Sequence, residues 1–113
     1  MEVNIMTHTD KEVQEYSLQK LAILFSVFGD TGRVKIINTL LGGEYCVNHL
    51  SEAVEMSQSA VSHQLKVLKT NNIVKSRRDG KNVYYSLDDE HIKDIFEIGL
   101  EHVSHTHDPY EEE

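Results

Sequence analysis

The spacing of apolar residues along this chain changes over one short segment, and that change restricts the folds available to it. Before residue 73, apolar side chains recur at three- and four-residue steps, as they do on the buried face of an α-helix. The runs 73–77 and 82–87 are instead rich in β-branched and aromatic residues, which favour strands. The segment 78–81 between them contains Asp-Gly, a strong signal for a tight hairpin turn. Because helical spacing returns after residue 87, the sequence predicts helices, then one β-hairpin, then a last helix.

Four helices are expected ahead of the hairpin, and turn residues separate them. The breaks fall at Gly29-Asp30, at Gly42-Gly43 and around 56–58, where Ser57 is suited to cap the following helix. The first helix is expected to bury one apolar face, and the others to turn shorter stripes inward. The expected ranges are 10–28, 31–41, 47–54 and 58–69. The expected inward residues are Val13, Tyr16, Leu21, Leu24, Phe25 and Phe28 in the first, Val34, Ile37, Leu40 and Leu41 in the second, Val47, Leu50, Ala53 and Val54 in the third, and Val61, Leu65 and Leu68 in the fourth.

A last helix is expected to begin after Asp88 or Asp89, either of which can cap it, and to reach about residue 104 or 107. Its apolar seam is expected to comprise Ile92, Ile95, Phe96, Gly99 and Val103. Two helices joined by a short turn and followed by a hairpin "wing" form a DNA-reading arrangement. The expected fold is therefore mostly α with a small β-hairpin, a winged helix-turn-helix of order α-α-α-α-β-β-α.

The charge of the chain is distributed unevenly, and the distribution bears on its partners. The formal net charge of the 113 residues is −8, which by itself argues against a nucleic-acid partner. Residues 56–87, however, hold six basic residues and a single acid, a net charge of +5 that leaves −13 for the remainder. Because salt screens charges over about 8 Å, the local charge matters more to a DNA backbone than the total. The sequence thus predicts a basic face on an acidic body, although a merely solvated face has the same composition.

The fourth expected helix has short polar residues at its start, where a recognition helix touches base edges in the major groove. Basic residues of the hairpin would grip flanking phosphates or enter the minor groove. Two ordinary interpretations compete: an amphipathic helix with a solvated face, and a charged hairpin tip that discourages aggregation. The predicted DNA-contacting residues are Ser57, Gln58, Ser59, Ser62, His63, Gln64 and Lys66 on the helix, and Arg77, Arg78 and Lys81 on the hairpin.

Four side chains of the last expected helix are suited to a metal ion, but one copy of the helix cannot bring them together. They form the pattern Asp89-x-His91 followed by His102-x-x-His105. His91 and His102 lie about 16 Å apart along a helix, whereas zinc–nitrogen bonds are only about 2.0–2.1 Å long. If two copies run antiparallel about a two-fold axis, the first pair of one copy meets the second pair of the other. The spacing therefore favours a homodimer with metal sites at its interface.

Each of the four residues also has an ordinary explanation. Asp89 suits a helix N-cap, and His91 suits a solvated first turn. His102 and His105 would interact favourably with the helix dipole at the C-terminal end. Only the joint pattern favours ligation, and imidazoles with a carboxylate suit zinc or a similar divalent ion.

Three further residues have roles that the sequence leaves open. His107 is a possible extra ligand, and His8 lies in an N-terminal tail that can still reach a metal. Cys46, the single cysteine, is expected to be a small buried residue at a helix start, with a reactive thiol as the alternative. The segment 102–105 lacks the glutamate of a metallohydrolase helix, and no glycine-rich phosphate loop occurs. We therefore expect a protein that is not an enzyme.

The chain is expected to form one domain flanked by two short tails. The expected divisions are a flexible N-terminal tail at 1–9, a winged-helix DNA-binding and dimerisation domain at 10–107, and an acidic C-terminal tail at 108–113. No apolar run approaches the roughly 20 residues of a membrane span, and the start of the chain lacks a secretory pattern. These features predict a cytoplasmic protein.

Two segments resemble the recognition helix and the wing of the ArsR/SmtB family of metal-responsive winged-helix repressors. Residues 57–69 read Ser-Gln-Ser-Ala-Val-Ser-His-Gln-Leu-Lys-Val-Leu-Lys, and residues 78–87 read Arg-Asp-Gly-Lys-Asn-Val-Tyr-Tyr-Ser-Leu. The metal pattern from Asp89 to His105 is similar to the C-terminal-helix site of the zinc-sensing branch. The resemblance covers nearly the whole chain, from about residue 13 to residue 107.

The resemblance implies a metal-responsive transcriptional repressor that acts as a homodimer. Without metal it would bind a palindromic operator of double-stranded DNA; Zn(II) bound by the four predicted ligands would lower DNA affinity and derepress genes of metal efflux or homeostasis. Cys46-Val47-Asn48 keeps only one thiol of the family's cysteine-based site, which should therefore be absent. His107 keeps a nickel- or cobalt-sensing repressor open as an alternative. A metal-buffering protein without a DNA role is the alternative from another class.

Overall fold

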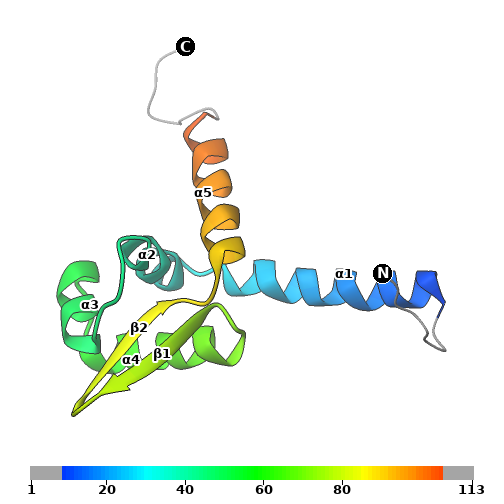
Figure 1. Ribbon diagram of the computed structural model, residues 1–113. Helices are drawn as coiled ribbons and strands as arrows, with labels where there is room; N and C mark the ends of the chain where they lie inside the picture. The colour runs from blue at the N-terminus through cyan, green and yellow to red at the C-terminus, as the bar shows by residue number, and fades with distance from the viewer. Residues whose placement is uncertain (1–8, 106–113) are drawn as a thin grey trace.

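The computed structural model describes residues 9–105, which form five helices and a two-stranded sheet (Figure 1). In chain order the elements are α1 (Asp10–Val27), α2 (Thr31–Leu40), α3 (Val47–Val54), α4 (Gln58–Thr70), β1 (Val74–Asp79), β2 (Asn82–Leu87) and α5 (Glu90–Ser104). The expected element order is confirmed, and the boundaries differ from the expected ones by at most about two residues. Within the described range, none of the helices has the length and apolar character needed to cross a membrane.

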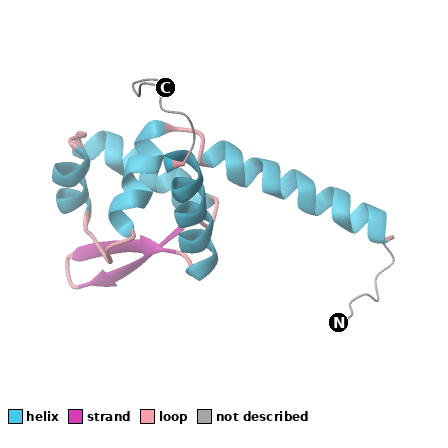
Figure 2. Cartoon of the chain, turned by 90° about the horizontal axis from the view of Figure 1, so that it is seen from above, coloured by secondary structure: helices cyan, strands magenta, loops and turns pink. Residues whose placement is uncertain are grey.

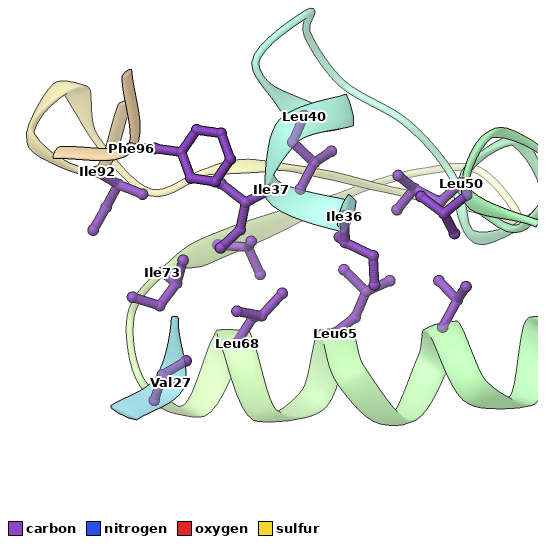
Figure 3. Packing of buried hydrophobic residues seen from close by; sticks show 13 residues of the cluster. Val27, Ile36, Ile37, Leu40, Leu50, Leu65, Leu68, Ile73, Ile92 and Phe96 are labelled. Atoms are coloured by element: carbon purple, nitrogen blue, oxygen red, sulfur yellow. The ribbon is translucent and has the colours of Figure 1, made fainter. Parts of the chain in front are cut away.

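One apolar core holds α2, α3, α4 and the hairpin together as a body. On α4, Val61, Leu65 and Leu68 are at most 1% exposed, which confirms the expected inward stripe. Figure 3 shows Leu65 and Leu68 pointing from α4 into the cluster that contains Ile36 and Ile37 of α2. Ile36 is fully buried, although the sequence did not predict it to face inward. α2 is covered by α3, α4 and β2, so it has more than one inward face.

The turn between α3 and α4 is short, and side chains fix it at both ends. α3 ends at Glu55, whose left-handed backbone (φ 57°) turns the chain sharply. Ser57 then caps α4 as expected, because its Oγ accepts a hydrogen bond from the Ala60 N–H at 3.0 Å. The Ser51 hydroxyl of α3 donates to the carbonyl of Met56 inside the turn. These contacts hold α3 and α4 together as a helix-turn-helix.

Other helices also begin at capping side chains. Asp89, rather than Asp88, caps α5 by accepting the Ile92 N–H at 3.1 Å. Thr9 caps α1 through a reciprocal capping box with Glu12. Each cap satisfies backbone N–H groups that a helix start otherwise leaves without partners.

The hairpin is antiparallel, and its register runs from Val74 opposite Leu87 to Asp79 opposite Asn82. The turn is therefore only Gly80-Lys81, and residues 78 and 79, expected in the turn, belong to β1. Gly80 adopts φ 65°, a conformation that a two-residue turn requires and that glycine reaches without a Cβ clash. β1 is buried only at Val74 and is exposed from Arg77 to Asp79, whereas β2 is half-buried from Val83 to Leu87.

A third segment joins this sheet, which the sequence did not predict. Tyr45, just before α3, exchanges two backbone hydrogen bonds of 3.0 and 2.8 Å with Tyr85 of β2. A single bridging residue leaves no repeating pattern in the sequence, so periodicity cannot reveal it. The pairing brings Glu44 beside the hairpin.

α1 projects from the body as an arm, and here the structure differs from expectation (Figures 1 and 2). Val27 is its one buried residue, whereas Val13, Tyr16 and Phe25 are 48%, 63% and 56% exposed. The prediction that one face of this helix is buried is wrong for a single chain, because the body reaches only the last turns of α1. The radius of gyration, 17.3 Å, accordingly exceeds the value of about 13 Å expected for a compact chain of this length.

α5 leaves the body in a different direction and is anchored only near its start (Figure 1). Ile92 and Phe96 are buried, and the Phe96 ring meets that of Phe28 edge to face with centroids 6.5 Å apart. Beyond Phe96 the expected apolar seam continues without cover. The exposed large apolar residues of this stretch are Ile98, Leu100 and Val103.

Replacement of Leu65 by alanine is expected to lower the free energy of unfolding by about 2–5 kcal/mol, because it removes buried methyl groups and leaves a cavity. Urea denaturation would measure the loss. Lys66→Ala is a matched control on the exposed side of the same helix, and it should stay within about 0.5 kcal/mol of the unmodified chain. An equal loss in both variants would contradict the packing of α4 described above.

Candidate DNA-binding surface and metal half-sites

The outer face of α4 carries most of the predicted DNA-contacting residues. Because the buried stripe fixes which side of α4 faces the core, the side chains on the opposite side point outward. Ser59, Ser62, His63 and Lys66 are all exposed on this face. They form a short polar and basic surface on the N-terminal two thirds of the helix, the part of a recognition helix that approaches base edges.

Two predicted residues at the start of α4 are exposed but already have partners. The Ser57 Oγ accepts the capping N–H, so its hydroxyl hydrogen remains available for a further acceptor. The Gln58 side-chain amide donates to the Asn48 side-chain oxygen of α3. The sequence did not predict the contact of Asn48 with Gln58. The only sign of it in the sequence is that α3 precedes α4 across a tight turn. This contact restricts the orientation in which Gln58 can meet a base.

Gln64 differs from the other predicted residues, because it is half-buried and turned toward α2. Its amide oxygen accepts from Arg33 Nη1 at 3.2 Å, and its amide nitrogen donates to Asp30 Oδ2 at 3.0 Å. The sequence does contain the signal: Gln64 lies three residues after Val61 and four before Leu68, at the edge of the buried stripe. The exposed polar surface of α4 therefore does not include the Gln64 amide.

The hairpin presents two of its three predicted basic residues freely. Arg78 and Lys81 are exposed at or beside the turn. Arg77 lies within β1 rather than at the tip, opposite Tyr84, and its guanidinium carbon is 5.0 Å from the centroid of that ring. The Arg77 Nε and Nη2 atoms also donate to both carboxylate oxygens of Glu44, each at 2.8 Å.

This fork-to-fork ion pair links the wing to the loop before α3. The Arg77 guanidinium hydrogen-bonded to Glu44 lowers the pKa of that carboxyl from its ordinary value of 4.5, and Glu44 raises the pKa of Arg77. On the other side of the hairpin, Lys69 at the end of α4 donates to Ser76 Oγ at 2.7 Å. The wing is therefore held to the loop before α3 and to the end of α4, by contacts that periodicity in the sequence did not predict.

The first metal half-site lies at the start of α5. The Asp89 Oδ1 atom is occupied by the Ile92 N–H, but Oδ2 lies 3.6 Å from His91 Nδ1. Their side chains are 50% and 88% exposed, so both donors are open to solvent. The backbone N–H of Ile92, with a smaller contribution from His91, lowers the pKa of Asp89 from its ordinary value of 3.8. The carboxylate is thus kept in the ionised form that a metal ligand needs.

The second half-site lies at the other end of the same helix. His102 is in the last turn of α5, and His105 is its C-cap, with both side chains exposed. Residues three apart share a helix face, so the two imidazoles are placed to act together. Among residues 9–105, a single chain assembles no group of three or more His, Cys, Asp or Glu residues suited to a metal. The four predicted ligands therefore form two separate pairs in one chain.

The donor chemistry of these pairs fits a borderline divalent ion such as zinc. Each half-site offers exposed nitrogen or oxygen donors without competing cysteine, and two half-sites supply four ligands. His8 and His107 lie outside the residues that the structure describes, as do the expected tails apart from Thr9. Cys46 is a half-buried free thiol at the N-cap of α3.

A groove of about 350 Å³ runs between the C-terminal end of α1 and the C-terminal part of α5. Its walls include Phe25, Phe28, Phe96, Leu100 and Val103. The groove connects the uncovered apolar faces of both projecting helices. Exposed apolar surface of this extent is typical of an interface rather than of a free surface.

Comparison with known proteins relates the chain to bacterial regulators. Residues 30–76 match the sequence profile of the bacterial regulatory proteins of the arsR family. The chain is 41% identical over 85 residues to a transcriptional repressor SmtB homolog from Synechocystis sp., an alignment that covers 75% of this chain and 64% of the relative. It is 41% identical over 93 residues to a cadmium resistance transcriptional regulatory protein CadC homolog from Staphylococcus aureus, covering 81% and 77%. It is 35% identical over 88 residues to the HTH-type transcriptional regulator NmtR of Mycobacterium tuberculosis, covering 78% and 73%.

Solved structures support the fold. A homodimeric winged helix-turn-helix DNA-binding domain from Mycobacterium bovis superposes with a TM-score of 0.79 at 21% identity, covering 96% of this chain and 99% of that one. Reduced HlyU from Vibrio cholerae superposes with a TM-score of 0.73 at 28% identity, covering 84% and 99%. The expected winged helix-turn-helix architecture is thereby confirmed.

The Glu44–Arg77 pair generates a pH prediction. Because the pKa of Glu44 is lowered on folding, the pair stabilises the fold above about pH 4.5 and loses its effect as pH falls through the lowered value. Glu44→Gln should therefore lower the thermal unfolding midpoint slightly at pH 7, and the difference should vanish once the pH is below the lowered pKa of Glu44, where a protonated glutamate resembles glutamine. Glu52→Gln, at an exposed position of α3, is the control. A difference that persists unchanged at low pH would contradict the ion-pair explanation.

Proposed function

The chain belongs to the ArsR family of bacterial regulatory proteins, and from this membership we propose that it is a metal-responsive transcriptional repressor of the zinc-sensing kind. Its homodimer binds a palindromic operator in the absence of metal. Zinc at the interface of the two α5 helices lowers that affinity and releases genes of metal efflux or homeostasis. As a regulator of this family, the chain is not an enzyme.

One observation carries the proposal: the four nitrogen and oxygen donors form two exposed pairs at opposite ends of one helix. An α-helix of 15 residues is about 22 Å long, so one α5 cannot close a site on itself. An antiparallel partner helix supplies the missing pair at each end and creates two equivalent sites. Asp89 and His91 of one chain would then bind the same ion as His102 and His105 of its partner. When bound, zinc would bridge the two α5 helices through these side chains.

The uncovered apolar faces of α1 and α5 support the dimer. Large apolar side chains on both helices are about half exposed or more. Three of them, Phe25, Leu100 and Val103, border the same groove. Burying them against a second copy would remove the apolar surface that a single chain leaves in water. The solved homodimeric domain from Mycobacterium bovis has the same fold. We therefore propose residues 10–107 as a combined DNA-binding and dimerisation unit.

The basic face supports DNA as the partner of the dimer. The net charge of +5 in residues 56–87 is concentrated on α4 and the wing, away from the acidic remainder. A two-fold dimer presents two recognition helices, so its operator should be a palindrome with half-sites about one helical turn apart or a multiple of it. Access to such an operator places the protein in the cytoplasm.

Release by metal follows from linkage between two sites on one molecule. If the α5 arrangement that metal favours differs from the one that suits the operator, each ligand weakens the binding of the other by the same factor. The ligands lie on α5 and the reading surface lies on α4 and the wing, so the effect must travel through the dimer geometry rather than by direct competition. Such couplings amount to about 1–3 kcal/mol, or roughly 5- to 150-fold in affinity.

Zinc is proposed over other metals on the basis of the donor set. The CadC homolog is named for cadmium resistance, but this chain has a single cysteine and cannot supply a pair of thiolates. Four ligands from imidazole and carboxylate suit tetrahedral zinc. If His107 joins them, a larger coordination number would instead favour nickel or cobalt. A metal-buffering protein is the alternative from another class, and it would not need the basic face.

The decisive experiment measures operator affinity with and without metal. Fluorescence anisotropy on DNA from upstream of the gene itself should give tight binding by the metal-free protein and about 5- to 150-fold weaker binding with zinc. Titrations with cobalt, read by absorption spectra, separate four-coordinate from six-coordinate sites and so test the role of His107. Equal operator affinity with and without every metal would overturn the proposal, and metal binding without any DNA binding would favour the buffer.

A mixing experiment tests whether each metal site is shared between chains. One variant carries Asp89→Asn with His91→Ala, where Asn preserves the helix cap, and the other carries His102→Ala with His105→Ala. Neither variant alone should bind cobalt tightly. After subunit exchange, half of the dimers are mixed and each restores one site, so cobalt binding should rise to about one quarter of the unmodified level.

If the mixture binds only as much cobalt as the two separate variants together, with no gain on mixing, a single chain builds the site. Size-exclusion chromatography of each variant is the control, because both must remain dimeric for exchange to be informative.

A further inference from the structure

A polar cluster joins the end of α1, the start of α2 and the middle of α4, and the proposed function has not used it. It consists of Asp30, Arg33 and Gln64, which are all half-buried. Arg33 Nε donates to the Val27 carbonyl at 2.7 Å, and Arg33 Nη1 donates to Gln64 Oε1 at 3.2 Å. Gln64 Nε2 donates to Asp30 Oδ2 at 3.0 Å, and this oxygen also caps α2 through the Arg33 N–H at 3.1 Å. The cluster is a closed set of hydrogen bonds across three helices.

The cluster lies where two parts of the molecule with different tasks meet. Val27 is the last residue of α1 and its one buried residue, so this junction determines how the α1 arm leaves the body. Its carbonyl is one of those that a helix end leaves without an internal partner, and Arg33 satisfies it. At the other end of the cluster, Gln64 belongs to the helix that carries the exposed reading surface. The Arg33 guanidinium thus contacts both α1, the proposed dimerisation arm, and α4, the proposed recognition helix.

We propose that Asp30, Arg33 and Gln64 form a strut that fixes the angle between α1 and α4, and that Gln64 is a positioning residue rather than a base-reading one. The inference rests on the proposed function, because it explains how a change in dimer geometry reaches the recognition helix. Both ends of the Gln64 amide are held by charged side chains, which bind it more strongly than neutral partners would. Turning toward a base would break both bonds and leave Arg33 without one of its acceptors.

Gly32 provides independent support from the other side of the cluster. A Cβ at this position would lie 3.2 Å from Asp30 Oδ2, 3.4 Å from Gln64 Nε2 and 3.4 Å from the Met56 methyl group. The distance to Asp30 Oδ2 is tighter than an ordinary contact and the other two are ordinary van der Waals contacts, so a larger residue would press on the carboxylate that Gln64 binds. The absence of a side chain at Gly32 lets the two helices approach closely enough for the strut to form.

The test compares the same substitution at two glutamines of α4. Gln64→Met keeps the size of the side chain but removes both hydrogen bonds, and it should weaken metal-free binding equally for an operator and for its single-base variants. It should also reduce the effect of zinc on operator affinity by about two- to thirtyfold, while zinc affinity without DNA stays unchanged. Gln58→Met, at the exposed start of the helix, should instead relax base preference at one operator position and keep the zinc effect.

Two more variants keep the test valid if Gln64→Met folds poorly. Gly32→Ala disturbs the strut from α2, raises local helix propensity, and should reduce the zinc effect in the same direction. Gln64→Glu places two carboxylates together and should also reduce it. Adding Asp30→Asn to Gln64→Glu leaves the net charge unchanged and restores a donor opposite the new carboxylate, so the zinc effect should recover.

The outcomes separate the strut from the function on which it rests. If the unmodified protein binds no operator, or binds it equally with and without zinc, the proposed function and the strut fall together. If the unmodified protein responds but Gln64→Met responds equally well, the strut alone is overturned. If Gln64→Met loses base preference at a single operator position, Gln64 is a base-reading residue and the positioning role is wrong. Thermal unfolding of each variant shows whether a reduced zinc effect reflects a loss of folding instead. If it does, recovery of the zinc effect in the Asp30→Asn/Gln64→Glu double variant decides whether the strut exists.

Discussion

The burial of one narrow stripe of α4 against α2 is the constraint on which the rest of this structure depends. Val61, Leu65 and Leu68 can be covered only if the opposite side of α4 faces solvent, so the core determines which polar residues the helix displays. The Ser57 cap and the left-handed turn at Glu55 then fix where the exposed face begins. The wing follows, because residues at the base of its two strands pack against the same core.

The molecule separates its tasks between a compact body and two projecting helices. The body carries the basic surface, while α1 and α5 carry uncovered apolar faces and the two ends of α5 carry the four predicted metal ligands. In the proposed function, a metal bound to α5 would therefore not block DNA directly but would alter how two bodies are held relative to each other. The polar cluster around Arg33 is suited to pass such a change on, because it is one of the few attachments of α1 to the body.

Helical and strand periodicity was sufficient to predict the elements, since local spacing largely determines them. It predicted the α4 stripe and the Ser57 cap, and it also marked a long apolar face on α1. Periodicity shows that such a face must be covered, but it does not show whether the same chain or a second copy covers it. For that reason the expected burial of Val13, Tyr16 and Phe25 was wrong for a single chain.

Polar contacts between distant segments were the part that spacing could not predict. The Glu44–Arg77 pair joins residues 33 positions apart, and the Asp30–Gln64 bond joins residues 34 positions apart. Neither contact leaves a repeating pattern in the sequence. Gln64 is the instructive case, because its place at the edge of the buried stripe was visible in the sequence while its polarity pointed toward the solvent. The four metal ligands remain a prediction from spacing, which rests on the rule that a helix fixes which donors can and cannot meet.

The uncovered apolar faces of α1 and α5 also affect the turnover of the protein in a cell. A copy whose α1 and α5 faces stay open is the form that proteases and chaperones would encounter, whereas a copy paired in the proposed dimer would hide the same surface. Pairing follows mass action, so the open form is most common when the chain is scarce. Turnover should then be fastest at low abundance, which makes the switch between silenced and expressed target genes depend steeply on how much of the regulator the cell makes.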